Sequence, residues 1–263
     1  MTEIFRGTWV VSYRELLRFV NERSRLVGSF AQPLIFLVIF GAGFGNLIGA
    51  VAPGVDFIQF MYPGIIAMGV LTTALFAGVS VVWDREFGFL RELLVAPLGR
   101  TGIVLGKALG ACVVGLLQVS LMLLIAPIVG VRVEVSTVLR LIPIVFVLSI
   151  ALSGLGLLVA SFMRSQQGFQ LLIQLLIFPL IFLAGVFFPI NQAPDWLQVV
   201  SKFNPLTYGV DAIRQVFLGS EAGAQLGVTV FGHTMALLEE VALMSAFAVI
   251  LLSLAAWAFN RQE

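Results

Sequence analysis

Six long apolar runs constrain the fold of this chain more than any other feature. They lie at about 27–48, 60–82, 105–129, 139–162, 167–188 and 237–259. A helix crosses roughly 30 Å of hydrocarbon with about 20 residues, so each run is long enough to span a membrane. Only 11% of the residues are charged, whereas a soluble domain carries about 25%. The sequence therefore predicts an all-α membrane protein with six transmembrane helices in a single domain, residues 1–263.

The Lys and Arg residues near the ends of these runs predict which side of the membrane each loop faces. An even number of spans returns the chain to its starting side, so both termini share one side. That side would carry eleven basic residues and the other side four. Because basic loops stay in the cytoplasm, we expect both termini to be cytoplasmic. The eleven residues are Arg6, Arg14, Arg18, Arg23, Arg25, Arg85, Arg91, Arg100, Lys107, Arg164 and Arg261.

Residues 1–26 predict an amphipathic helix that lies on the membrane surface. Apolar side chains recur there at spacings of three and four, and basic side chains do the same on another face. The apolar set is Phe5, Trp9, Tyr13, Leu16 and Val20. This pattern is typical of interfacial helices with a basic polar side. A plain membrane anchor fits the same residues equally well.

The stretch DREFGFLRELLVAPLGR, residues 84–100, holds six charged residues in seventeen positions between two apolar runs. At 100° per residue its first twelve residues form an amphipathic helix, with large apolar groups on one face and charges of both signs on the other. Pro97 and Gly99 end this helix before the third run. Mixed charge opposite an apolar face favours docking into a groove of another protein.

Glu86 departs from this pattern, because it lies on the apolar arc of the expected helix. A place in the first helical turn would explain it, since the helix dipole favours a carboxylate there. The alternative is an ion pair with an arginine of the N-terminal helix or with another chain.

Some polar residues lie inside the apolar runs or at their ends. Gln166, Gln170 and Gln174 recur every fourth residue at the start of the fifth run and form one polar stripe. Such residues usually face protein or water, and they serve either helix packing or a translocation path. No charged residue lies at the middle of a run, which argues against a proton- or sodium-coupled transporter. We expect Glu239 and Glu240, at the start of the sixth run, to be solvated; the alternative is that one of them reaches an arginine of the outer helices.

Residues 189–236, between the fifth and sixth runs, are too polar and too interrupted to cross the membrane. They hold two short amphipathic patterns, and Asn204-Pro205 separates the two because the residue before a proline disfavours helix. We therefore expect two short helices at, or dipping into, the outer leaflet. They form either a lid over an exit path or a cap on the bundle.

The sequence has no residue pattern that indicates catalysis or metal binding. Its one histidine, His233, has no nearby partner in sequence, and its one cysteine, Cys112, cannot form an internal disulfide. The stretch GIVLGKA, residues 102–108, resembles a phosphate-binding loop, but its spacing is wrong and it lacks the Ser or Thr that binds Mg²⁺. We therefore expect no ATP hydrolysis by this chain alone. A net charge of +1 gives no attraction for nucleic acid.

The order of these parts resembles the membrane subunit of an ABC exporter of the type-2 permease family, which includes drug, lipo-oligosaccharide and polysaccharide exporters. The resemblance covers nearly the whole chain. Its most specific pieces are YPGIIAMGV (62–70), DREFGFLRELLVAPLGR (84–100) and NPLTYGVDAIR (204–214). It implies a multi-pass permease of a prokaryotic cytoplasmic membrane that works as a homodimer with two copies of a separate cytoplasmic ATPase. ATP and Mg²⁺ would bind that ATPase, and no cofactor would bind this chain.

The resemblance also implies roles for particular residues. Residues 84–100 would be the coupling helix that sits in a cleft of the ATPase, and the turn at 164–167 would be a smaller second contact. The segment 189–236 would form re-entrant helices that close the exit. The coupling residues would be Asp84, Arg85, Glu86, Arg91, Glu92 and Arg164. The outer gate would comprise Asn204, Pro205, Tyr208, Asp211 and Arg214.

A translocation path would follow the fifth run together with the first or second. The candidate path residues are Phe36, Phe40, Tyr62, Phe76, Gln118, Gln170, Gln174 and Phe178. They suit a hydrophobic drug and an amphipathic lipid equally, and export of a lipid-linked oligo- or polysaccharide is the alternative. A membrane scaffold or sensor without transport is disfavoured by the glutamine stripe, and a membrane enzyme by the missing catalytic groups.

Overall fold

The computed structural model describes residues 2–44, 57–86, 100–219, 226–230 and 233–261, and these residues are mostly helical. The longer helices are α1 (Thr2–Asn21), α2 (Arg23–Phe44), α3 (Phe57–Leu75), α4 (Val79–Glu86), α6 (Arg100–Ile125), α7 (Val135–Phe162), α8 (Gln166–Leu183), α9 (Asp195–Ser201), α10 (Pro205–Leu218) and α12 (Leu237–Asn260). Three short 3₁₀ turns are η2 (Phe76–Gly78), η3 (Ala126–Val129) and η4 (Ile190–Gln192). A short antiparallel hairpin with two residues in each strand, β1 (Thr229–Val230) and β2 (His233–Thr234), was not expected from the sequence.

Within the described residues, five segments are long and apolar enough to cross a membrane. They are Phe57–Glu86, Thr101–Val129, Val135–Phe162, Gln166–Leu183 and Leu237–Asn260. These segments confirm five of the six predicted apolar runs. The remaining run, 27–48, falls partly on α2, where the apolar stretch that the structure describes is the shorter Ala31–Gly41. The six-span layout therefore stays a prediction.

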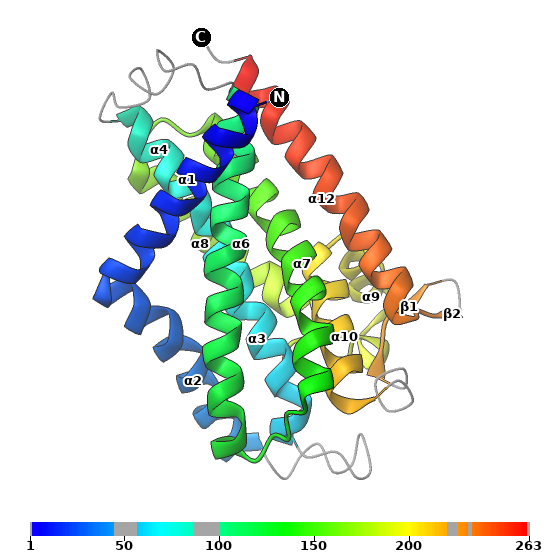
Figure 1. Ribbon diagram of the computed structural model, residues 1–263. Helices are drawn as coiled ribbons and strands as arrows, with labels where there is room; N and C mark the ends of the chain where they lie inside the picture. Colours follow the sequence, from blue (N-terminus) through cyan, green and yellow to red (C-terminus); the bar gives the residue numbers. More distant parts are fainter. Residues whose placement is uncertain (1, 45–56, 87–99, 220–225, 231–232, 262–263) are drawn as a thin grey trace.

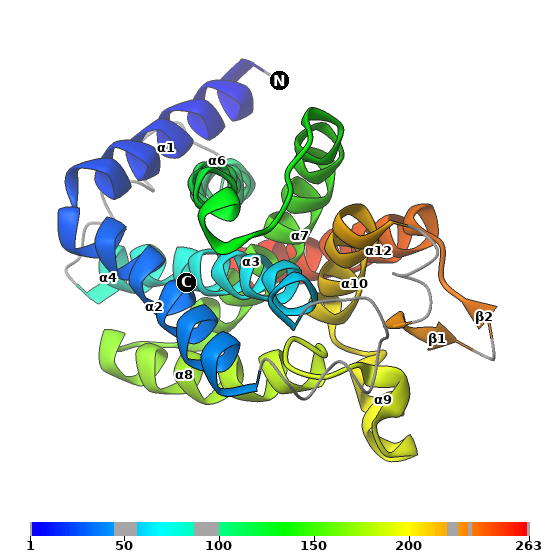
Figure 2. The ribbon, with the colours of Figure 1, turned by 90° about the horizontal axis from the view of Figure 1, so that it is seen from below.

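Helix α3 forms the centre of the bundle, with α6 on one side and α8 on the other (Figure 2). The candidate span Phe57–Glu86 begins with α3, and 78% of its most apolar stretch is buried inside the protein. For the span formed by α8 the buried share is 17%. Phe60, Tyr62 and Ile65 are fully enclosed, because α2, α6, α7 and α10 all pack against α3. The segment continues from α3 through η2 into α4 without leaving helical geometry.

Helix α1 packs along α6 through a row of glycines (Figure 1). A Cβ added at Gly106 would lie 2.8 Å from Cβ of Val11, and one at Gly110 would lie 2.9 Å from Cβ of Glu15. Ser12 Oγ donates to Gly106 O at 2.9 Å, which the close approach makes possible. Small residues four apart bring helix backbones together in this way. The stretch GIVLGKA, which resembled a phosphate-binding loop, is therefore a helix-packing surface.

Both described termini and the end of α4 lie at one end of the bundle, which we call the terminal end (Figure 1). Helices α9 and α10 and the β1–β2 hairpin lie toward the opposite end, which we call the distal end. The two short helices expected between 189 and 236 are confirmed as α9 and α10, with Asn204 capping the second. Their place in the outer leaflet stays a prediction.

Candidate functional site

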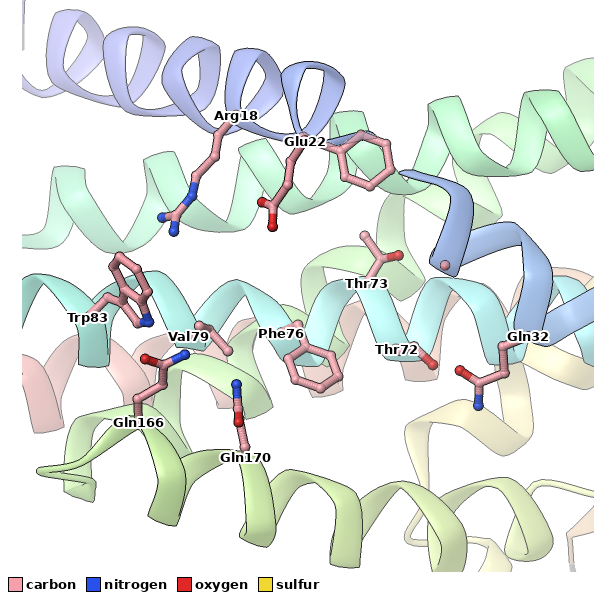
Figure 3. Close-up of a pocket in the computed structure, with 12 residues that line it drawn as sticks. Arg18, Glu22, Gln32, Thr72, Thr73, Phe76, Val79, Trp83, Gln166 and Gln170 are labelled. Carbon is pink, nitrogen blue, oxygen red and sulfur yellow. The ribbon is translucent and has the colours of Figure 1, made fainter. Parts of the chain in front are cut away.

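A cavity of about 400 Å³ opens in the terminal half of the bundle (Figure 3). Helices α1, α2, α3, α4 and α8 and the turn η2 all contribute to its walls. Its lining comprises Arg18, Phe19, Glu22, Gly28, Gln32, Thr72, Thr73, Phe76, Val79, Trp83, Gln166 and Gln170. The cavity therefore lies between the predicted interfacial helix and the segments assigned to the first, second and fifth spans.

The cavity wall combines hydrogen-bonding groups with aromatic surface. Figure 3 shows Arg18 reaching in from α1, Glu22 from just beyond its end, and Gln166 and Gln170 facing them from α8. The Arg18 guanidinium carbon lies 5.2 Å from the Trp83 ring centroid, a cation–π distance. One cation and one anion make the wall electrically balanced, and amides beside aromatic rings suit an amphipathic molecule.

The structure does not bring all the predicted path residues together. Phe76 and Gln170 line the cavity. Phe36 and Phe40 instead pack with Phe187 in an aromatic cluster, with Phe40 and Phe187 stacked at a centroid distance of 4.9 Å. Gln174 and Phe178 are exposed on the outer side of α8.

Two further predicted path residues, Tyr62 and Gln118, lie in the buried packing between α3 and α6. Tyr62 Oη donates to the Met122 carbonyl oxygen, and Thr73 Oγ1 donates to Gln118 Oε1. Both side chains are fully buried. In this structure they serve helix packing, as polar residues in membrane bundles commonly do.

Four charged residues form a network around the buried Lys107 of α6, beside the cavity: Lys107 itself, Arg14 and Glu15 on α1, and Asp84 on α4. Lys107 is 1% exposed. Its Nζ lies 3.1 Å from Asp84 Oδ2 and 3.5 Å from Glu15 Oε1, and it donates to Ser80 Oγ at 2.7 Å. Arg14 Nη2 lies 3.4 Å from the same Asp84 oxygen. The sequence placed Lys107 with the basic residues that flank the apolar runs, but it lies inside α6 and joins three helices.

Glu15 belongs to this network and lies on α1, outside the candidate membrane spans. The pKa of its carboxyl is shifted. Burial acts to raise the pKa of its carboxyl, but Lys107, Arg14 and Arg18 together outweigh burial and hold the pKa below its ordinary value. The carboxylate is thus the stable form, and it helps to compensate the buried Lys107 ammonium.

Arg85 and Glu86 hold the turn between α7 and α8. Arg85 Nη1 donates to the carbonyl oxygens of Ser161 at 3.0 Å and Met163 at 2.8 Å, at the carboxyl end of α7. Glu86 Oε2 accepts from the backbone N–H of Gln166 at 2.9 Å, at the amino end of α8. Both charges match the helix dipoles that they meet.

These contacts correct one expectation about Glu86. It ends α4 instead of opening a helix, so a first-turn position does not explain it. The change from apolar to charged residues near position 84 is not a helix boundary, because no proline or glycine interrupts the chain there. Arg91 and Glu92 lie outside the described residues, and Arg164 is exposed beside the turn.

The predicted outer-gate residues lie on or beside α10, and all five are buried. Asn204 Nδ2 donates to Leu180 O at 2.8 Å, and its Oδ1 caps α10. Pro205 opens α10, Tyr208 Oη donates to Lys202 O at 2.8 Å, and Asp211 accepts from Val228 N at 2.7 Å. Arg214 Nη2 donates to Gly185 O at 2.8 Å. The motif therefore joins α10 to the end of α8 and to the segment before α12.

Glu240 is not solvated and instead fits the alternative of contact with an arginine of the outer helices. It is 0% exposed and lies against Asp211, Arg214 and Gln215 of α10, whereas Glu239 is exposed and pairs with His233 at 3.2 Å. Burial lowers the pKa of Arg214 to about 10, against the opposing effects of Asp211 and Glu240. The sequence spacing could have indicated that Glu240 is buried. Residues four apart lie on one face of a helix, and Glu240 shares the buried face of α12 with Met244 and Ala248.

Comparison with known proteins places the chain in a family. Residues 6–218 match the family model described as ABC-2 type transporter. The chain belongs to the ABC-2 type transporter family. It is 31% identical over 212 residues to a transport permease named ycf38 from Cyanophora paradoxa, covering 80% of this chain and 73% of that protein. It is 31% identical over 196 residues to nodulation protein J of Rhizobium leguminosarum bv. trifolii, covering 74% of each.

A third relative is named as a multidrug ABC transporter permease, YbhR of Escherichia coli K12. It is 32% identical over 170 residues, which cover 63% of this chain and 45% of that protein. ABC-2 permeases are membrane subunits that work with an ABC ATPase partner. The family therefore agrees with a membrane-spanning transport protein.

Proposed function

We propose that this ABC-2 permease is the membrane half of an ATP-driven exporter that moves a hydrophobic or amphipathic substrate out of the cell. The cavity between α1, α4 and α8 carries the proposal, because it adjoins the residues assigned to coupling. The working complex would be a homodimer of this chain with two copies of a cytoplasmic ATPase, which binds ATP and Mg²⁺. The terminal end would face the cytoplasm.

The cavity suits a substrate that enters from the inner leaflet. Phe19, Phe76 and Trp83 offer apolar surface for a hydrocarbon or aromatic group. Gln166 and Gln170 offer amide donors and acceptors for a polar group at the other wall. An apolar pocket with a few polar groups is the usual form of a binding site for small molecules.

Coupling to ATP would begin at residues 84–100. Asp84 connects this segment to α1 and α6 through Arg14 and Lys107, and Glu86 connects it to α8. ATP-driven closure of the two ATPase subunits would move the segment and thereby these helices. A substrate is moved only if ATP binding stabilises one permease state more than the other.

The outer-gate residues of α10 would control release. Asn204 and Arg214 hold the end of α8, and Asp211 holds the segment before α12. Movement of α8 would therefore disturb these contacts. The exit would open between the two permease copies when α9 and α10 give way.

A second candidate substrate is a lipid-linked oligo- or polysaccharide. The observation that favours it is the number of hydroxyl and amide groups around the cavity. Thr72, Thr73 and Gln32 add to the two glutamines of α8, and such groups can hydrogen-bond sugar hydroxyls.

The test is transport into inside-out proteoliposomes that contain the permease and its ATPase. Three labelled probes would be compared: a lipophilic dye, a short-chain phospholipid and a polyprenyl-linked oligosaccharide. We expect ATP-dependent uptake of at least one probe, abolished when the ATPase cannot hydrolyse ATP. Absence of ATP-dependent movement for all three, in a complex that hydrolyses ATP, would contradict export of this substrate class.

A further inference from the structure

Helix α8 is attached at its terminal end to the segment assigned to coupling. Glu86, the last residue of α4, accepts from the Gln166 N–H, the first of α8, at 2.9 Å. Arg85 holds the preceding turn by donating to Ser161 O and Met163 O. A displacement of Glu86 must therefore either break these bonds or move the start of α8.

The other end of α8 is attached to the segment assigned to the outer gate. Asn204 donates to Leu180 O at 2.8 Å and Thr207 to Leu183 O at 3.3 Å, both in the last turn of α8. Arg214 donates to Gly185 O just beyond it. Asn204, Thr207 and Arg214 are all buried, so their bonds are shielded from water.

Between its ends α8 contacts its own chain along one apolar stripe, formed by Phe169, Ile173, Ile177 and Ile181, and the rest of its surface is largely exposed. Only 17% of its span is buried, less than in any other candidate span of the described residues. Its 18 residues extend roughly 27 Å at 1.5 Å per residue. The helix continues through Pro179 without interruption. The buried stripe holds α8 against the core by non-directional apolar contact, and the directional hydrogen bonds at its two ends fix where it sits along that stripe.

We propose that α8 is the physical connection between the coupling segment and the outer gate, and that Glu86 and Asn204 are the positioning residues that attach its ends. Movement of residues 84–86 shifts α8, and α8 shifts α10. Gln166 and Gln170 move with it, so the cavity changes shape in the same step. The inference rests on the proposed function, since it assigns the route by which ATP-driven motion reaches the exit.

A double-mutant cycle tests this connection. Glu86→Ala and Asn204→Ala are compared alone and together, and the number of substrate molecules exported per ATP hydrolysed is measured in proteoliposomes. Distant, independent sites give effects that multiply. We expect each single variant to lower the ratio at least fivefold, and the double variant to be no worse than the poorer single one. A double variant whose loss equals the product of the two would overturn the proposal.

Ser165→Ala provides the matched control for the terminal end. Ser165 Oγ accepts from Gly168 N at 3.2 Å and so caps α8 without attaching it to α4. Combined with Asn204→Ala, it is expected to give effects that multiply. Non-multiplying effects in this pair would mean that loosening α8 alone explains the cycle, and the proposal would fail.

A second measurement does not need transport. Spin labels at Phe203→Cys and Arg132→Cys, both exposed positions toward the distal end, report the distance between α9 and the start of α7. Cys112→Ala removes the one native thiol. In the complex with its ATPase we expect the label distance to change on trapping with ATP and vanadate, and Glu86→Ala to abolish the change.

An unchanged response in Glu86→Ala, or no response in the wild-type complex, would overturn the connection. A wild-type complex that responds to ATP but exports no probe would contradict the proposed function and leave the connection standing.

Discussion

Lys107 gives the sharpest test of the buried charge network. The change is Lys107→Met, which keeps the length and apolar stem of the side chain and removes its ammonium group. In the wild type, the Lys107 ammonium lies 3.1 Å from Asp84, 3.5 Å from Glu15 and 2.7 Å from Ser80 Oγ. After the change, the two carboxylates lose their one fully buried cation and keep the half-exposed Arg14 beside both, with Arg18 acting on Glu15.

The expected loss in the free energy of unfolding depends on which charged groups are left without a partner. Removing one partner of a buried ion pair costs about 3–5 kcal/mol, because the remaining charge stays uncompensated. For a chain of this size, each kcal/mol shifts the unfolding midpoint by roughly 2–4 °C. We therefore expect Lys107→Met to lower the midpoint by about 10 °C. Adding Asp84→Asn and Glu15→Gln removes the uncompensated charges and should restore most of the loss.

The assay is thermal unfolding of the permease in lipid nanodiscs, followed by circular dichroism. The control is Lys202→Met, since Lys202 is the only other lysine and is half-exposed. Its midpoint should shift by less than about 3 °C, as expected for a surface charge. If Lys107→Met unfolds at the wild-type temperature, or if the triple variant is less stable than the single one, the reasoning about uncompensated charge is wrong.

Three further predictions follow from the site. Gly106→Ala should destabilise the α1–α6 contact by about 1–3 kcal/mol through overpacking, while Gly43→Ala, with open space around it, should be neutral or stabilising; thermal unfolding distinguishes them. Gln170→Leu should raise KM for the exported probe by about tenfold per 1.4 kcal/mol of lost hydrogen bonding; Gln167→Leu, on the same helix but outside the cavity lining, should not. Because the pKa of Glu15 is lowered on folding, its contribution is present above its ordinary value of 4.5 and lost as pH falls below it; the stability difference between wild type and Glu15→Gln should shrink in acid, and a difference that grows would contradict this.

The membrane spans could be predicted because they depend on a local property, the length of an apolar run, which can be read directly from the sequence. An apolar run of about twenty residues must be buried in lipid or protein whatever its neighbours are, so five runs were located from composition alone. The split of residues 189–236 into α9 and α10 was equally local, because Asn204 is a favourable N-cap and Pro205 a favourable first residue of a new helix.

The charge network could not be found in this way. Glu15, Asp84 and Lys107 lie on three helices that are far apart in the sequence, and periodicity relates only residues on one helix. The glycine row of α6 was a visible signal, since Gly102, Gly106 and Gly110 recur every fourth residue. It indicates close packing but not the partner, which the structure shows to be α1.

The order of charges in Asp84–Arg85–Glu86 has a physical reason that composition alone does not show. Successive helical residues point about 100° apart, so the three side chains reach different neighbours. Asp84 meets the cations Arg14 and Lys107, Arg85 meets carbonyls at the end of α7, and Glu86 meets an N–H at the start of α8. Each sign is the one that its neighbour favours.

Exchanging the last two charges tests this reasoning. The double change Arg85→Glu and Glu86→Arg keeps composition and net charge but sets each group against the wrong helix end. Since hydrogen bonds to charged groups contribute about 1.5–3 kcal/mol each, we expect stability to fall by about 3 kcal/mol or more. Thermal unfolding measures the loss, and Arg85→Lys with Glu86→Asp, which keeps each sign in its place, is the control. Equal stability of the exchanged and the conservative variants would show that the segment needs only its charges and not their order.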